Sequence, residues 1–283
     1  MKRYALCIGI NDYPGNGNDL AGCVNDAHDW AAALERRGFK VKTLLNRAAT
    51  GRRMRDEIAA LLGRARAGDL VVVQYSGHGS FVPDRDGDEP DGLDECLCPW
   101  DVASQGPIVD DELAAIYKDR PRGVRLLMVS DSCHSGTVAR FAPIRTPPTL
   151  ASGRAPRRTV RFLPPLAFLS ARAAAGVAHA AAGLKRRGRD SAFLTSSARP
   201  AGRFGGLLLA GCQDSEYSYD AWFRGRPNGA FTFVALNALK RLPLSATYQR
   251  WFEAIRRLLP SRQYPQSPSL YGAAAVRGER VFA

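Results

Sequence analysis

The sequence predicts an α/β fold in which a mainly parallel sheet of about six strands lies between two layers of helices. Short apolar runs at 70–73 and 124–129 are rich in β-branched residues and lack polar alternation, as strands buried on both faces of a parallel sheet do. Segments with helical spacing separate such runs, which favours right-handed crossovers. With 283 residues and 45% hydrophobic content, the chain can bury a substantial core.

The first half of the chain carries the clearest pattern. Ala27, Trp30 and Leu34 share one face of a helix that Gly38 ends, and Thr50 is suited to cap the next helix. The expected elements are a strand at 4–10, a helix at 23–37, a strand at 39–45, a helix at 51–66, strands at 70–73 and near Cys96, a helix at 110–117 and a strand at 124–129.

Regularity is lost between residues 140 and 203, which are rich in Arg, Ala and Pro. We interpret this stretch as a long insertion, although its alanine-rich part at 167–184 could form a helix. Arg172 and His179 argue against a membrane span there. The expected elements beyond it are a strand at 206–212, helices near 230–241 and 246–258, and a C-terminal strand.

The charge is uneven and the cysteines are sparse. The formal net charge is +13, yet residues 84–101 carry eight acids against Arg85. No zinc-finger spacing, RNA-binding aromatic signature or helix-turn-helix accompanies the basic remainder, so we expect a solvated surface and no specific nucleic-acid binding. Six cysteines without CxxC spacing predict reduced thiols. With no apolar run of roughly 18 residues and no signal pattern, we expect a cytoplasmic protein without membrane contact.

Two short motifs carry the chemistry, Tyr75-Ser76-Gly77-His78-Gly79 and Asp131-Ser132-Cys133-His134-Ser135-Gly136. Each follows a predicted strand, and parallel strands end on one edge of a sheet, so His78 and Cys133 can emerge side by side. A cysteine attacks as a thiolate, which needs a base. His78 fits that role, and the N–H groups of Gly79 and Cys133 could form an oxyanion hole. His134 is a rival base, and a buried histidine with an inert thiol is the structural alternative.

These residues resemble the caspase-fold cysteine peptidases, specifically bacterial metacaspases of the type I or orthocaspase kind. The resemblance also rests on Ile8-Gly9-Ile10-Asn11 and Gly22-Cys23-Val24-Asn25-Asp26-Ala27, and covers residues 3–140. It is weaker over 204–272, where it rests on 210–214 and 228–232. It implies a caspase-like three-layer α/β/α sandwich.

The same resemblance implies one catalytic domain over residues 1–283. Its parts would be a large-subunit-like part at 1–139 with the His/Cys dyad, the insertion at 140–203 and a small-subunit-like part at 204–283.

The resemblance also implies a substrate pocket (S1) formed by Asp26, Ser76 and Asp131, which would receive a basic P1 side chain. Caspases have Gln two residues before the nucleophile, where this chain has Asp131. Carboxylates attract an Arg or Lys side chain and repel Asp. The alternative for Asp26 is an acid that interacts with the dipole of its helix, and it could do both.

Calcium-dependent metacaspases bind the ion at positions that match Asp94, Asp110 and Asp111, with a fourth acid where this chain has Arg140. A cation there removes a ligand, and the acidic loop lacks EF-hand order. We therefore expect that no cofactor is required. A solvated loop with Asp110 capping the following helix is favoured over a Ca²⁺ site.

The predicted function is a cysteine endopeptidase that cleaves protein or peptide substrates after Arg or Lys and acts as a monomer. Family members often cut themselves after the nucleophile segment, so we also expect self-cleavage between 140 and 203. The basic candidates are Arg140, Arg154, Arg157, Arg158, Lys185, Arg186, Arg187 and Arg189. A solvated linker would carry the same residues. The alternatives to the enzyme are an inactive caspase-like scaffold and a basic nucleic-acid-binding module.

Overall fold

A six-stranded sheet forms the centre of the computed structural model, which describes all residues except 16, 85–86, 88–91, 134–158, 178–204 and 214–215. The strand order is β12-β9-β7-β3-β1-β2, and only β12 is antiparallel to its neighbour. The bounds are β1 Arg3–Gly9, β2 Lys40–Leu45, β3 Leu70–Ser76, β7 Arg125–Asp131, β9 Leu207–Ala210 and β12 Ser269–Tyr271.

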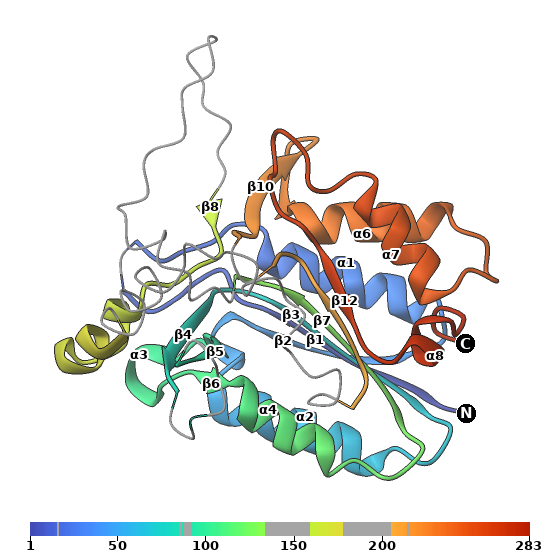
Figure 1. Ribbon diagram of the computed structural model, residues 1–283, viewed down its shortest axis with the longest axis horizontal. Coiled ribbons are helices and arrows are strands. Elements are labelled where there is room, and N and C mark those ends of the chain that lie inside the picture. Colours follow the sequence, from blue (N-terminus) through green and yellow to red (C-terminus); the bar gives the residue numbers. More distant parts are fainter. Residues whose placement is uncertain (16, 85–86, 88–91, 134–158, 178–204, 214–215) are drawn as a thin grey trace.

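Helices cover both faces of this sheet (Figure 1). On one face lie α1 (Cys23–Glu35), α6 (Ala230–Arg241) and α7 (Tyr248–Arg256), and on the other lie α2 (Gly51–Arg64) and α4 (Asp110–Lys118). Two further short helices are α3 (Val102–Gln105) and α8 (Ala274–Arg277). The predicted three-layer sandwich with a mainly parallel sheet is thereby confirmed.

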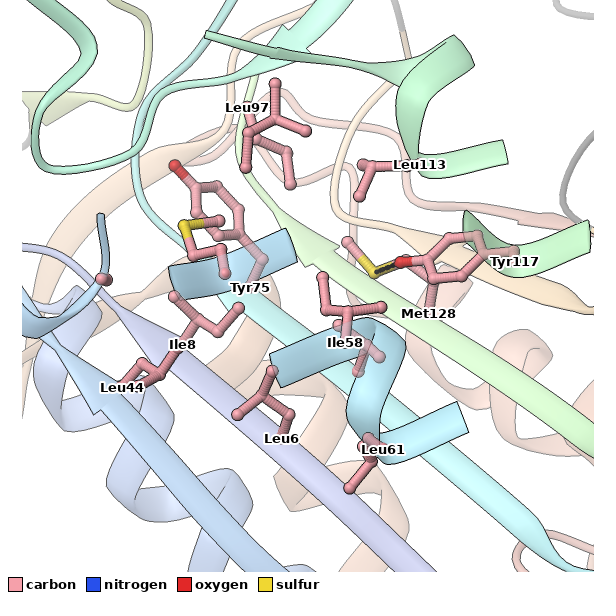
Figure 2. Packing of buried hydrophobic residues seen from close by; sticks show 14 of the residues in the cluster. Leu6, Ile8, Leu44, Ile58, Leu61, Tyr75, Leu97, Leu113, Tyr117 and Met128 are labelled. Carbon is pink, nitrogen blue, oxygen red and sulfur yellow. Dashed lines mark hydrogen bonds between the residues drawn. The ribbon is translucent and has the colours of Figure 1, made fainter. Parts of the chain in front are cut away.

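Alternation along the buried strands divides the core between the two faces. In β1, Leu6 and Ile8 point to the α2 and α4 side, whereas Ala5 and Cys7 point to the α1 side. Figure 2 shows the buried cluster on the α2 and α4 side, in which Leu6 lies near Ile58 and Leu61 of α2.

In the same cluster, the buried side chain of Tyr117 on α4 contacts the sheet. Its hydroxyl donates to Met128 Sδ at 3.3 Å (Figure 2).

Two tryptophans join the helices on the opposite face. Trp30 of α1 and Trp251 of α7 are fully buried, and their rings meet edge to face with centroids 6.0 Å apart. The Trp30 indole N–H also donates to Thr232 Oγ1 in α6 at 3.3 Å. This contact joins the N-terminal part of the chain to the part that follows the insertion.

Two small antiparallel sheets lie beside the central one, and the sequence indicated only one of their strands, near Cys96. The first is formed by β4 (Gly79–Pro83), β5 (Leu93–Leu97) and β6 (Ile108–Val109). The second has the order β11-β10-β8, with β8 at Thr159–Val160, β10 at Tyr219–Phe223 and β11 at Arg226–Gly229.

The insertion contains regular structure of its own. After β8 come a 3-10 turn, η3 (Pro165–Ala167), and helical residues 171–177, within the alanine-rich stretch where a helix was a possibility. A second 3-10 turn, η1 (Asn46–Ala48), precedes α2. No helix in the described part of the chain is long and apolar enough to cross a membrane.

The central sheet determines where the two motifs lie. Neighbouring strands β3 and β7 run parallel and in register, so that Ser76 lies opposite Asp131 at their C-terminal ends. His78 and Cys133 each follow two residues later. The sheet therefore delivers the histidine and the cysteine to the same edge.

Replacing Trp30 with Ala should destabilise the fold, because it removes a fully buried indole and its bond to Thr232. We expect a loss of about 3 to 5 kcal/mol in the free energy of unfolding, measured by urea denaturation. The matched control is Trp222→Ala on β10, whose side chain is 48% exposed and should change stability by less than about 0.5 kcal/mol. Equal losses in the two variants would contradict this assignment.

Candidate active site

Two tyrosines fix the backbone of His78 at the edge of the sheet. The His78 N–H donates to the Tyr13 hydroxyl at 2.9 Å, and the Tyr75 hydroxyl donates to the His78 carbonyl oxygen at 2.7 Å. The Tyr13 ring also packs on the imidazole, with ring centroids 4.9 Å apart. The ring of His78 is therefore held in one place before any substrate arrives.

A third group selects the tautomer of His78. Its Nε2 lies 2.7 Å from the carbonyl oxygen of Asn18, and a carbonyl only accepts, so Nε2 carries the hydrogen. In the neutral ring, Nδ1 then keeps the lone pair. Burial lowers the pKa of His78 to about 4, so the imidazole is neutral at pH 7 and Nδ1 is able to accept a proton.

Cys133 follows β7 and is fully buried. Its Sγ accepts a hydrogen bond from the Ser218 N–H at 2.8 Å and lies 3.5 Å from the Ser218 carbonyl oxygen. Around it pack Phe81, Leu93 and Phe162. The thiol therefore lies between the end of β7 and the residue that precedes β10.

The most telling contact joins the two motifs to a third segment. The N–H groups of Gly79 and Cys133 both donate to the carbonyl oxygen of Arg161, at 3.0 and 3.2 Å. Two convergent backbone donors on one carbonyl oxygen, beside a cysteine, are the arrangement that stabilises the oxyanion in acyl transfer. The sequence predicted this pair of donors, but it did not predict that a residue of the same chain would occupy them.

The side chain of Arg161 enters a pocket of carboxylates and is completely buried. Its Nη2 lies 2.6 Å from Asp26 Oδ2 and 2.9 Å from Asp220 Oδ1, and its Nη1 lies 3.2 Å from Asp131 Oδ2. Burial by itself would lower the pKa of Arg161, but the carboxylates of Asp131, Asp26 and Asp220 reverse that effect and raise it.

Backbone and side-chain donors hold two of the three carboxylates in position. Asp26 accepts from the Gly229 N–H at 2.9 Å and from Asn228 Nδ2 at 3.0 Å. Asp131 accepts from the hydroxyl of Thr232 at 2.7 Å and from its N–H at 3.0 Å. The stretch 228–232, noted in the sequence only for its resemblance, thus supports two acids from the other part of the chain.

The pocket requires a cation to keep its charge. Burial raises the pKa of Asp26 to about 7 even though Arg161 acts to lower it, and Asp131 adds to the rise. Without the guanidinium the pKa of Asp26 would rise further, because the carboxylates would repel one another with no cation between them. In this structure the side chain that occupies the pocket is the basic one of Arg161.

The pocket wall also needs glycine at one position. A Cβ on Gly229 would overlap Asp131 Oδ2 and would lie 2.6 Å from Arg161 Nη1. Its φ of −68° suits any residue, so space and not conformation demands glycine here.

The backbone on both sides of Arg161 is held as an added strand. Before it, β8 pairs antiparallel with β10, with Val160 opposite Tyr219, and the Arg161 N–H donates to the Ser218 carbonyl oxygen at 3.0 Å. After it, the Leu163 N–H donates to the Gly79 carbonyl oxygen at 3.0 Å. Extended pairing of this kind is how clefts bind peptides.

Of the three predicted pocket residues, Asp26 and Asp131 contact Arg161 directly. Ser76 is buried opposite Asp131, but its Oγ accepts from Gln74 Nε2 at 2.8 Å, and within the described chain it makes no hydrogen bond to Arg161. Its role in the pocket stays a prediction. Asp26 also lies in the first turn of α1, so the helix-dipole alternative holds as well.

Sequence reasoning missed Asp220 and Arg161. Asp220 carries no motif, and its carboxylate reaches the pocket because β10 faces the start of α1, where it accepts from the Gly22 N–H at 3.0 Å. Arg161 was one of many arginines in the insertion. The only available signal was its position between apolar residues, in Thr159-Val160-Arg161-Phe162-Leu163, unlike the basic clusters nearby.

Three of the remaining predicted residues lie on described elements. Asp94 lies on β5, whereas Asp110 and Asp111 begin α4. The described ranges contain no group of three or more His, Cys, Asp or Glu side chains placed to hold a metal ion. His134, Arg140 and the other basic residues named as self-cleavage candidates lie outside the described residues.

Comparisons with known proteins identify the family of the chain. The family model described as "Metacaspase, peptidase C14 domain" matches residues 3–141. "Metacaspase-1" of Mycosarcoma maydis is 33% identical over 308 residues, which cover 99% of this chain and 73% of that protein. "Metacaspase-1" of Cryptococcus neoformans is 32% identical over 95% of this chain and 62% of its own length. "Metacaspase-7" of Arabidopsis thaliana is 41% identical over 48% of this chain.

A solved structure extends the similarity to the whole chain. The crystal structure of protein GSU0716 from Geobacter sulfurreducens superposes with a TM-score of 0.71 at 32% identity, covering 100% of this chain and 99% of that one. The fold class expected from the resemblance is therefore confirmed. Since the matched model and the relatives agree, this chain belongs to the metacaspase family of caspase-like C14 cysteine peptidases.

Proposed function

We propose that the chain is an endopeptidase that cleaves after Arg or Lys with Cys133 as nucleophile and His78 as base. One observation carries the proposal. Arg161 places its guanidinium among three carboxylates while its carbonyl oxygen accepts from Gly79 and Cys133 N–H groups. A bound substrate with arginine at P1 would make the same two sets of contacts.

The proposed reaction uses only groups of the chain and water. His78 Nδ1 takes the proton of the Cys133 thiol, and the thiolate sulfur attacks the carbonyl carbon of the P1 residue. The negative oxygen of the tetrahedral intermediate is stabilised by the two backbone N–H groups. His78 gives its proton to the leaving amine, the C–N bond breaks, and a thioester remains. His78 then activates water, which releases the carboxylic acid and restores the thiol.

The carboxylates explain the proposed choice of substrate. In the Arg161 guanidinium, Nη2 contacts Asp26 and Asp220, and Nη1 contacts Asp131. The planar group can serve several carboxylates because its two terminal nitrogens point in different directions. A lysine ammonium would supply one compact charge at the same place. An acidic P1 side chain would meet three like charges. We include Asp220 with Asp26 and Asp131 in the pocket, with Ser76 beneath it.

We propose that the enzyme needs no cofactor, since a thiol, an imidazole and backbone donors supply the chemistry. Asp94, Asp110 and Asp111 take no part in the steps above. We further propose a monomer in the cytoplasm that acts on proteins or peptides with a basic P1 residue. The six cysteines are buried free thiols, which is typical of a reducing compartment.

Self-cleavage within the insertion completes the proposal, at the bond between Arg161 and Phe162. This bond follows the carbonyl group that lies in the proposed oxyanion hole, beside the nucleophile. Arg161 thus replaces the basic residues first considered, which lie outside the described residues. An inactive scaffold would bind the same segment and leave it intact.

The first test compares fluorogenic peptides that end in Arg, Lys or Asp. Arg and Lys peptides should be cleaved and Asp peptides should not. Cys133→Ala should abolish cleavage, and His78→Ala should lower the rate by a factor of about 10² to 10⁴.

Asp220→Asn should lower kcat/KM for the Arg peptide by about 100-fold, because it removes one buried charge partner. The matched control, Asp56→Asn, alters an exposed carboxylate on α2. Faster cleavage of the Asp peptide would contradict the pocket.

The second test uses the low pKa of His78. Between pH 6.5 and 4 the unfolded chain binds a proton at His78 that the folded chain does not, so stability falls as the pH falls. At about 1.4 kcal/mol per pH unit, the loss should reach about 3 kcal/mol. Urea denaturation of Cys133→Ala and of Cys133→Ala/His78→Gln at each pH isolates this group, because other groups cancel in the difference. Parallel curves for the two proteins would refute the buried neutral histidine.

The third test measures self-cleavage by intact mass spectrometry. The wild type should yield fragments 1–161 and 162–283, and Arg161→Lys should yield the same pair. Arg161→Ala should lose this cut, and Cys133→Ala should stay whole. Arg172→Ala, an exposed arginine of the same insertion, serves as the matched control and should be cut like the wild type. An uncut wild type, under conditions in which Arg peptides are cleaved, would end this part of the proposal.

A further inference from the structure

The residue that follows Arg161 is bound as specifically as Arg161 itself. Phe162 stacks on Phe81 of β4 with ring centroids 5.7 Å apart and an angle of 24° between the planes. Tyr217 approaches from the side that leads into β10, with centroids 6.3 Å apart. The Phe162 side chain is only 8% exposed. Its ring therefore lies between aromatic residues contributed by two separate parts of the chain.

This aromatic contact adjoins the nucleophile. Phe81, Phe162 and Cys133 belong to one buried apolar cluster, which also contains Leu93 at the start of β5. Val177 closes the cluster from within the insertion. The fixed walls are Phe81, Leu93 and Tyr217, because these residues lie outside the inserted segment.

Backbone bonds determine which residue of a bound chain enters this place. Gly79 donates to the carbonyl oxygen of Arg161 and accepts from the N–H of Leu163, so one residue of the enzyme holds the peptide on both sides of Phe162. The Ser80 hydroxyl donates to the Leu163 carbonyl oxygen at 2.7 Å. With the P1 carbonyl fixed in this way, the next side chain of any substrate points to the same walls.

We propose that Phe81, Leu93 and Tyr217 form an apolar subsite that selects an aromatic or large aliphatic residue immediately after the cleaved bond. The proposal rests on the proposed function, since it takes Arg161 as the model of a P1 residue. It adds a second determinant of specificity, on the leaving side of the bond. Substrates would then be recognised by a basic residue followed by an apolar one.

Physical chemistry favours this selection over a neutral surface. Burying an aromatic side chain removes apolar area from water and adds ring contacts, whereas glycine gains neither. An aspartate would lose its hydration among apolar walls. An aromatic residue at this position should therefore raise kcat/KM at least about tenfold over glycine, equal to about 1.4 kcal/mol.

The test uses internally quenched peptides that are identical through Val-Arg and then carry Phe, Leu, Gly or Asp. For the wild type we expect kcat/KM to fall in that order. Tyr217→Ala and Phe81→Leu should each lower the ratio of the Phe peptide to the Gly peptide, because each removes one aromatic contact of this residue. Trp222→Ala, an exposed aromatic on β10, should keep the wild-type ratio and rate. The two subsite variants change different elements, so misfolding of one leaves the other as a test.

Three results would overturn the subsite, and they can be told apart. Equal kcat/KM for the Phe and Gly peptides, with Arg still required at P1, would disprove the subsite and leave the proposed function standing. Failure to cleave any Arg peptide would overturn the proposed function and the subsite with it. If Tyr217→Ala and Phe81→Leu both fold and both keep the wild-type ratio of the Phe peptide to the Gly peptide, other residues select this side chain. That result would also refute the proposed subsite.

Discussion

The contact between the Arg161 guanidinium and three buried carboxylates holds the site together. Asp26 comes from α1, Asp131 from the end of β7 and Asp220 from β10, so one cation joins three elements that are far apart in the sequence. Charges in a low-dielectric interior are stable only when paired, and removing one partner typically costs about 3 to 5 kcal/mol. While Arg161 stays in place these charges are compensated, and its departure would leave uncompensated negative charge in the pocket.

The pocket is built from two stretches of the chain, one before residue 140 and one after residue 203. Asp26 and Asp131 belong to the first part, but their hydrogen-bond donors, Gly229 and Thr232, belong to the second. The second part also adds β9 and β12 to the central sheet and contacts α1 through Trp30. Neither part could form the pocket alone. The sheet and the helices on its α1 face hold the two parts together, so they do not depend on the covalent link through the insertion.

The sequence predicted what depends on local pattern. The buried runs of the parallel sheet, the helices between them, and the placement of His78 and Cys133 at one edge follow from periodicity and strand direction. Asp26 and Asp131 were found because they lie within motifs. Asp220 and Arg161 were not, since each acts through tertiary pairing of a short strand, β10 or β8, that has no periodic signal. The pocket role of Ser76 stays a prediction, because in the structure its hydroxyl accepts from Gln74 on the same strand.

A ligand that is part of the chain behaves differently from one that is free in solution. A tethered segment is present near its site at an effective concentration of about millimolar, whatever the dilution of the protein. Arg161 and its neighbours β8 and Phe162 are bound in this way, by charge, by strand pairing and by ring stacking together. A free peptide at micromolar concentration binds only to those molecules in which this segment has left the cleft, for example after the proposed cut that follows Arg161. Opening of the cleft is therefore a first-order event within one molecule, and its rate does not depend on how much substrate is present.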